Sequence, residues 1–384
     1  MISVSKLYCG ITGANDRLRY SNTAHRKPVV VWNATKRCNL HCIHCYSKSE
    51  NRLYRDELTT NEAKCFVKDL AEFGVPVLLF SGGEPLLRKD LFEVGQLASD
   101  LGIKPVLSTN GTLITESLAE QIKTAGFVYV GVSIDGVGET NDKFRGVQKA
   151  FDAAVRGIRN CINAGVKTGL RFTVTKHNCK DVPKIFDFVE VENIPRVCFY
   201  HLAYAGRGSE IIKDDLTHKQ TREFMDYVLI KAEGFLNRGS GTEILTVDNH
   251  ADAAYIYLKL KEKDGEKAEE ALRLMRINAG NSSGIGIAGV DFNGYVHPDQ
   301  FWQHYSLGNI RQRRFSEIWV DGSEPLLNAL RNRPEHLKGR CRQCRFLDIC
   351  NGNLRVRAEA VYGDTWAPDP ACYLTDEEIT RGGS

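Results

Sequence analysis

The sequence predicts an α/β protein with a parallel sheet, followed by a smaller C-terminal α+β region. Three observations support this: short apolar runs alternate with longer amphipathic segments from residue 28 to about 202, polar motifs end several of the apolar runs, and cysteines cluster again after residue 340. Alternating β/α units of this length are typical of parallel sheets. Six units fit an open doubly wound sheet or an incomplete barrel, and both gather functional residues at the carboxyl ends of their strands.

The predicted elements follow in order along the chain. Strands are expected at 28–33, 75–81, 104–109, 127–134, 166–175 and 196–202, where apolar residues run together. Helices between them are expected at 59–74, 90–101, 115–125, 148–164 and 181–190, the first with a Thr cap and a closing Gly74. Charged helical segments follow at about 216–237 and 262–277, and 284–299 predicts a hairpin with its turn near Asn293-Gly294. We therefore expect an N-terminal extension (1–27), a β/α core (28–215), a helical connector (216–280) and a C-terminal domain (281–384).

Composition and charge narrow the class of protein. With 42% hydrophobic residues, 26% charged residues and a net charge of +3, the chain is typical of globular proteins and its charge alone does not indicate nucleic-acid binding. It lacks the roughly 18 consecutive apolar residues of a membrane span and the apolar core of a signal peptide. We expect a cytoplasmic protein with neither a membrane nor a nucleic-acid partner. In that reducing compartment, twelve cysteines indicate metal binding before disulfides.

Three of the cysteines, Cys38, Cys42 and Cys45, lie on one loop after the first predicted strand. A structural zinc site requires four ligands, and His41 or His44 would have to supply the fourth. A cubane iron–sulfur cluster held by three thiolates would leave one iron open to bind a reactant. The missing fourth cysteine favours the cluster.

This loop resembles the C-x3-C-x2-C motif of the radical SAM family, in which S-adenosylmethionine (SAM) chelates the open iron of a [4Fe–4S] cluster. One electron then cleaves SAM and releases a 5′-deoxyadenosyl radical. The resemblance implies a partial (β/α)6 barrel, with Glu84 at the methionine amino group and Arg145 at its carboxylate. It implies SAM contacts from "SGGEP", "STNG", "SID", "NDKFRG" and the residue before the third cysteine, namely Gly82, Gly83, Glu84, Ser108, Asn110, Ser133, Asp135, Arg145 and His44. His44 departs from the aromatic residue that many members carry.

A second cysteine set lies near the C-terminus and consists of Cys341, Cys344, Cys350 and Cys372. Zinc is one alternative, because CxxC pairs in cytosolic proteins often bind it. The spacing and the preceding "LGNIRQRRFSEIW" resemble the SPASM/twitch extension of radical SAM enzymes, which implies an auxiliary cluster. The hairpin lacks the further cysteines of the full extension, so we expect one auxiliary [4Fe–4S] cluster and two clusters in all. Cys65, Cys161 and Cys198 are expected in the core, while Cys9 and Cys179 have no predicted role.

Three stretches, 200–208, 296–319 and 341–378, resemble tetrapyrrole-modifying radical SAM enzymes. The resemblance implies loss of acetate side chains from 12,18-didecarboxysiroheme, giving iron-coproporphyrin III in heme biosynthesis through siroheme. Removal of propionates from the same substrate in heme d1 biosynthesis is the alternative. Peptide modification and electron transfer without catalysis are further alternatives. An enzyme of this class also requires an electron donor such as ferredoxin or flavodoxin.

A polycarboxylate substrate fits the uneven charge of the chain, because eleven Lys or Arg stand against five Asp or Glu between Arg311 and Arg357. A solvated basic face is the alternative. Arg355 and Arg357 would make bidentate bonds to the carboxylates. Candidates to handle the substrate are His201, Tyr204, Arg207, His297, Asp299 and His304. The last three, in an aromatic stretch, form the preferred cluster, and a hydrogen-bonded structural role is the alternative for each.

Overall fold

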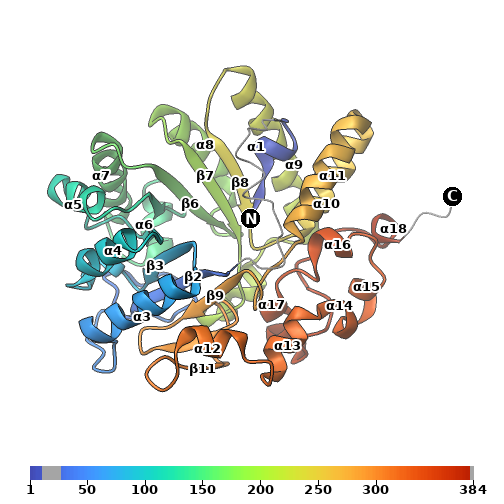
Figure 1. The fold of residues 1–384 in the computed structure, drawn as a ribbon. Helices are drawn as coiled ribbons and strands as arrows, with labels where there is room; N and C mark the ends of the chain where they lie inside the picture. Colours follow the sequence, from blue (N-terminus) through green and yellow to red (C-terminus); the bar gives the residue numbers. More distant parts are fainter. Residues whose placement is uncertain (11–26, 381–384) are drawn as a thin grey trace.

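The computed structural model describes residues 1–10 and 27–380, which are organised around one sheet of eleven strands (Figure 1). Its strand order is β1-β8-β7-β6-β5-β4-β3-β2-β9-β10-β11. The six predicted strands are parallel neighbours in chain order: β2 (Val29–Thr35), β3 (Val77–Gly82), β4 (Lys104–Thr109), β5 (Tyr129–Ser133), β6 (Thr168–Val174) and β7 (Arg196–His201). The sheet stays open at both edges, as expected for a partial barrel.

The helices that connect these strands surround the outer side of the curved sheet (Figure 1). They are α3 (Thr60–Phe73), α4 (Leu91–Asp100), α5 (Glu116–Thr124), α7 (Ala150–Asn163) and α8 (Val182–Val191), all at predicted places. Helix α3 has the predicted ends: Thr59 forms a capping box with Glu62, and Gly74 closes the helix at a φ of 85°. The short helix α6 (Glu139–Arg145) was not expected. Segments of 3-10 helix follow three of the strands: the single turns η1 (Pro85–Leu87) and η2 (Cys179–Asp181) and the longer, kinked η3 (Gly206–Asp214).

Two segments that we expected outside the core extend the sheet. Strand β8 (Glu243–Val247) lies within the predicted helical connector and pairs parallel with β7. Strand β1 (Ile2–Ser3) pairs antiparallel with β8 and leads into α1 (Val4–Leu7), whereas residues 11–26 of the predicted extension lie outside the described residues. The connector also contains α9 (His218–Asn237), α10 (Ala251–Lys263) and α11 (Gly265–Asn278). The helix expected at 262–277 corresponds to α11, and α10 is an additional helix that precedes it.

The C-terminal region continues the same sheet. The predicted hairpin is present as β9 (Ile287–Val290) and β10 (Tyr295–His297), and β9 pairs parallel with β2. Strand β11 (Gly308–Asn309) then pairs with β10. Short helices complete the region: α12 (Phe315–Val320), α13 (Pro325–Arg331), α14 (Arg333–His336), α15 (Gly339–Arg342), α16 (Leu347–Cys350), α17 (Arg355–Tyr362) and α18 (Asp376–Ile379). They lie below α10 and α11 in Figure 1.

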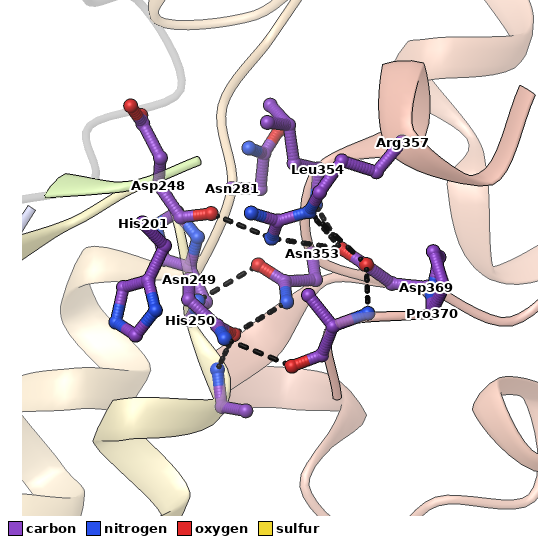
Figure 2. A network of polar contacts seen from close by, with 12 residues as sticks. His201, Asp248, Asn249, His250, Asn281, Asn353, Leu354, Arg357, Asp369 and Pro370 are labelled. Carbon is purple, nitrogen blue, oxygen red and sulfur yellow. Dashed lines mark hydrogen bonds and ion pairs between the residues drawn. The ribbon is translucent and has the colours of Figure 1, made fainter. Parts of the chain in front are cut away.

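A buried polar network attaches this C-terminal region to the core (Figure 2). Arg357 of α17 forms an ion pair with Asp369 at 3.0 Å and donates a hydrogen bond of 2.6 Å to the Asp248 carbonyl, which follows β8. Asn353 donates to the side chain of Asn249 at 2.7 Å. The core and the tail are therefore held together by buried hydrogen bonds as well as by the shared sheet.

None of the helices in the described part of the chain combines the length and the apolar character that crossing a bilayer requires. Two predicted core cysteines, Cys161 and Cys198, are buried. Cys65 is exposed on α3, so its assignment to the core is wrong. The reason is its position on the outer face of an amphipathic helix, where a cysteine needs no packing partner.

Candidate active site

The loop with the first three cysteines leaves the end of β2 and rests on the end of β3. A Cβ atom on Gly82 would lie 2.3 Å from the carbonyl oxygen of Thr35, and one on Gly83 would lie 2.2 Å from that of Arg37. The Gly83 and Glu84 amides donate hydrogen bonds of 2.7 and 2.8 Å to the same two carbonyls. The two glycines therefore position the cysteine loop through backbone contact. This role is additional to the SAM contact predicted for them.

The three cysteines of this loop lie together, with Cys38 and Cys42 buried. Burial, with the charge of nearby Glu84, raises the pKa of the Cys38 thiol to about 12. Three N–H donors face the sulfurs: the Leu40 amide and Asn110 Nδ2 lie 3.4 and 3.9 Å from Cys38 Sγ, and Arg145 Nη1 lies 3.6 Å from Cys42 Sγ. Donors to sulfur suit thiolates that ligate an iron–sulfur cluster. The donor set thus fits the predicted cluster.

Glu84 is fully buried beside this loop. It accepts hydrogen bonds from Thr109 Oγ1 at 2.7 Å and from the Asn110 amide at 2.8 Å. Burial raises the pKa of Glu84 to about 7. Asn110 in turn donates to Asn39 at 2.8 Å. The predicted SAM contacts at the ends of β3 and β4 therefore form one connected group.

Asp135 is the second fully buried carboxylate of the site. It forms an ion pair with Arg145, whose guanidinium also reaches Cys42. His44 Nε2 lies 3.6 Å from Asp135 Oδ2. Burial lowers the pKa of His44 to about 4, so that its ring is neutral at pH 7. Two of the predicted SAM contacts, Asp135 and Arg145, are thus linked to the cysteine loop through an ion pair and the contact of Arg145 with Cys42.

A cavity opens at the carboxyl ends of the strands. Its lining includes His44, Tyr46, Ser108, Ser133, Arg145, Arg171, Tyr200, His201, Asp248 and Phe301. Four buried polar atoms of this lining have no hydrogen-bond partner among the described residues: His44 Nδ1, Arg145 Nε, Arg171 Nε and Gln300 Oε1. A polar ligand such as SAM would satisfy such atoms, so the cavity fits the cofactor.

The second cysteine set also surrounds a small cavity. Phe346, Leu347 and Leu374 contribute to its lining, as do all four cysteines of the set: Cys341, Cys344, Cys350 and Cys372. Burial and the proximity of the other three thiols raise the pKa of Cys350. Four thiols around one shared space fit the predicted auxiliary cluster.

Three of the residues predicted to handle the substrate lie at or beside the first cavity. His201 lines it but is bound at 2.9 Å to Asp252 of α10. Tyr204 and His304 line a neighbouring groove of about 1140 Å³, where Tyr204 donates to Asp215 and His304 contacts Glu359. Each of the three has a hydrogen-bond partner within the protein. The alternative of a structural role therefore stands for each.

The other three residues line neither the cavity nor the groove. Arg207 donates to the Cys42 carbonyl at 2.8 Å and so supports the cysteine loop. His297 and Asp299 are buried in the C-terminal region, where His297 contacts the Tyr305 carbonyl at 2.7 Å. The structure does not bring His297, Asp299 and His304 together at a substrate surface. We grouped the three residues because they are close in sequence, but the fold buries the side chains of His297 and Asp299.

The prediction that Arg355 and Arg357 bind substrate carboxylates is wrong. Both side chains are fully buried. Arg355 donates to the Ala367 carbonyl at 2.6 Å, and Arg357 donates to the Leu202 carbonyl and pairs with Asp369. Other arginines of the basic surplus form ion pairs within the protein, including Arg311 with Glu62, Arg313 with Asp321 and Arg314 with Asp69. A count of charged residues along the sequence does not distinguish arginines that bind a substrate from arginines that form contacts within the protein.

The cavity residues that the sequence did not single out include Tyr46 and Arg171. Tyr46 and Phe301 line both the cavity and the groove, and their ring centroids are 5.4 Å apart. The two hollows therefore adjoin at these aromatic side chains. Arg171 could have been singled out from the sequence, because it is the charged residue within the otherwise uncharged strand "TGLRFTV".

Comparisons with known proteins place this site in a family. The radical SAM superfamily matches residues 32–189, and the SPASM iron–sulfur cluster-binding domain matches residues 284–345. Fe-coproporphyrin III synthase from Methanosarcina barkeri is 52% identical over 99% of both chains. Pre-heme d1 synthase from Dinoroseobacter shibae is 45% identical over 92% of this chain and 87% of that protein.

Solved structures show the same fold. SuiB from Streptococcus suis, bound to SAM, superposes with a TM-score of 0.72 at 19% identity, covering 93% of this chain and 80% of that one. The structure of anSMEcpe with bound AdoMet gives 0.69 at 20% identity, covering 90% and 94%. The chain belongs to the radical SAM superfamily. It is an enzyme with a C-terminal SPASM domain, and its cofactors are SAM and two [4Fe–4S] clusters.

Proposed function

We propose that the enzyme removes acetate side chains from 12,18-didecarboxysiroheme and so produces iron-coproporphyrin III. The observation that carries this proposal is the 52% identity, over 99% of both chains, to a protein named for that product. Removal of propionates from the same substrate is the second candidate, favoured by the 45% identity to pre-heme d1 synthase.

The shape of the site supports a large, flat substrate. The groove beside the SAM cavity has a volume of about 1140 Å³ and is lined by Lys36, Lys48, Tyr46 and Phe301, among others. Aromatic faces favour a macrocycle, and lysines favour its carboxylates. Because the groove adjoins the cavity, the ring would lie in the groove while one side chain reaches the SAM site.

In this proposal the residues of the chain would have the following roles. Cys38, Cys42 and Cys45 would hold the SAM-binding cluster, and the second cysteine set the auxiliary cluster. With a donor such as ferredoxin or flavodoxin, the cluster held by the first three cysteines would supply the electron for reductive cleavage of SAM to a 5′-deoxyadenosyl radical. Glu84 and Arg145 would bind the amino and carboxylate groups of SAM. The cavity wall would keep water from the reacting groups.

Product analysis tests the proposal. Reconstituted enzyme is incubated anaerobically with 12,18-didecarboxysiroheme, SAM and a reductant, and the tetrapyrrole is identified by mass. Loss of acetate groups is expected, whereas loss of propionate groups would establish the second candidate. A substrate that stays intact while SAM is cleaved would refute both. The variant without Cys38, Cys42 and Cys45 controls for chemical degradation.

A further inference from the structure

Arg171 of β6 is a cavity-lining cation that lacks a carboxylate partner among the described residues. Its Nη1 donates to the Ser108 hydroxyl, and its Nε is buried without an acceptor. Two other arginines of the core differ from it, because Arg145 pairs with Asp135 and Arg196 with Glu243. Arg171 as a whole is half-buried, and a partly desolvated guanidinium without a counter-charge still costs free energy. Its position therefore indicates an anionic ligand.

The neighbouring strand makes room for this side chain. Gly131 of β5 stands between Arg171 and Ser108, since its backbone pairs with Ser108 of β4. A Cβ atom on Gly131 would lie 2.2 Å from Arg171 Nε. Gly131 does not have a positive φ. The glycine is therefore needed because it leaves room for the arginine, and not because of its backbone conformation. The guanidinium thus crosses β5 over a glycine to reach the cavity.

We infer that Arg171 binds the carboxylate of the side chain that the enzyme removes. This inference rests on the proposed function and adds a specificity residue to it. The reacting side chain has to enter the cavity that Arg171 shares with Arg145 and His44, next to the cysteine loop. A guanidinium there can hold a carboxylate by two parallel hydrogen bonds. Arg171 would thereby replace Arg355 and Arg357, which are buried elsewhere, as a substrate anchor.

The carboxylate of SAM is the other possible source of the same chemistry. Arg145 is better placed for it, because its guanidinium lies 3.6 Å from Cys42 Sγ on the cluster loop. Arg171 instead donates to Ser108 on the far side of β5, and because Ser108 is itself a predicted SAM contact, SAM affinity has to be measured as well. The two sources make different predictions for SAM affinity, which the experiment measures.

The test uses Arg171→Gln, Arg171→Lys and Gly131→Ala, the last of which keeps the arginine but fills the space that it crosses. Arg159→Gln is the matched control, because Arg159 is exposed and paired with Glu192. Dissociation constants are measured anaerobically for 12,18-didecarboxysiroheme, for iron-coproporphyrin III and for SAM. Iron content confirms that each variant carries its clusters.

We expect the dissociation constant for 12,18-didecarboxysiroheme to rise tenfold or more in Arg171→Gln and Gly131→Ala, and less in Arg171→Lys, which retains the charge. The constant for iron-coproporphyrin III, which has lost the acetate groups, should stay within about twofold, as should every constant of Arg159→Gln.

Three results would overturn the inference while wild type still binds the tetrapyrrole. Unchanged substrate affinity in Arg171→Gln would show that the residue is structural. Equal weakening of substrate and product would show that it holds another part of the macrocycle. A matching loss of SAM affinity would assign it to the cofactor. Wild-type enzyme that fails to bind the tetrapyrrole would instead refute the proposed function, and this assignment with it.

Discussion

Single residues of the same type behave differently in this protein because their surroundings differ. Burial raises the pKa of Glu84 to about 7, whereas hydrogen bonds from Arg311 and Thr59 lower the pKa of Glu62 to about 2. Only the first of these carboxylates changes charge near neutral pH. A change of pH near neutrality should therefore alter the charge of Glu84 in the site while leaving Glu62 on the surface ionised.

SAM affinity should depend on the charge of Glu84. If the ionised carboxylate binds the methionine amino group, affinity is highest above pH 7 and falls as Glu84 becomes protonated below it. The loss approaches about tenfold per pH unit well below the pKa. SAM dissociation constants measured from pH 6 to 8.5 check this. Glu84→Gln should bind weakly with a flat profile, Glu62→Gln should keep the wild-type profile, and a flat wild-type profile would contradict the assignment.

The two cysteine sets should each account for half of the iron. Wild type should hold about eight irons per chain, four for each cubane. Replacing Cys38, Cys42 and Cys45 with Ala should leave about four and abolish 5′-deoxyadenosine formation, while Cys65→Ala, at an exposed position, should retain all eight. Iron analysis and product chromatography measure both effects. Four irons with one zinc in wild type would show that the second set binds zinc.

At the scale of elements, the end of β3 and the loop after β2 fit together without room for side chains. The clash distances at Gly82 and Gly83 involve backbone carbonyl oxygens, which cannot move aside as a flexible side chain can. The orientation of the cysteine loop therefore depends on a neighbouring strand.

Gly83→Ala should displace this loop. Forcing a methyl group to within 2.2 Å of the Arg37 carbonyl should destabilise the protein by about 1–3 kcal/mol and reduce the iron bound by the loop. Melting temperature and iron content measure these effects. Gly241→Ala is the control, because a Cβ there meets nothing within 4 Å. Normal iron and stability in Gly83→Ala would show that the loop adapts.

Local sequence signals predicted these elements well, and long-range pairing poorly. The six core strands, the cap of α3 and the hairpin follow from apolar runs, Thr59, Gly74 and the Asn293-Gly294 turn. Strand β8 was missed because five residues between helices give little periodic signal, and its pairing with β1 joins distant segments. Spacing also grouped the two cysteine sets, whose members lie together in the structure. The role of Arg357 was misjudged because burial depends on the whole fold.

At the scale of the whole molecule, the C-terminal region is held to the core by buried charge. Arg357 and Asp369 are both completely shielded from solvent, and Arg357 also donates to carbonyls of the core. A buried ion pair is costly to break, because the remaining charge has no compensation. The pair therefore contributes to the attachment of the SPASM domain.

Arg357→Met should destabilise the protein by about 3–5 kcal/mol, since it leaves Asp369 unpaired. The double variant Arg357→Met/Asp369→Leu should recover part of this loss. Arg313→Gln, which removes a partly exposed pair with Asp321, should cost less than about 1 kcal/mol. Anaerobic urea unfolding provides the comparison. A double variant no more stable than Arg357→Met would show that the hydrogen bonds to the carbonyls dominate.

The pairing of β2 with β9 also constrains how the chain folds while it is being made. Strand β2 begins at Val29 and β9 at Ile287, and ribosomes add roughly 5–20 residues per second. The edge of β2 that pairs with β9 therefore stays unpaired for roughly 10–50 s after its synthesis. The strand at its other edge, β3, is made early. During that interval the nascent chain presents an apolar strand edge next to the first cysteine loop, and such an edge can pair with other chains. Chaperones that shield strand edges would matter most for this protein before its hairpin leaves the ribosome.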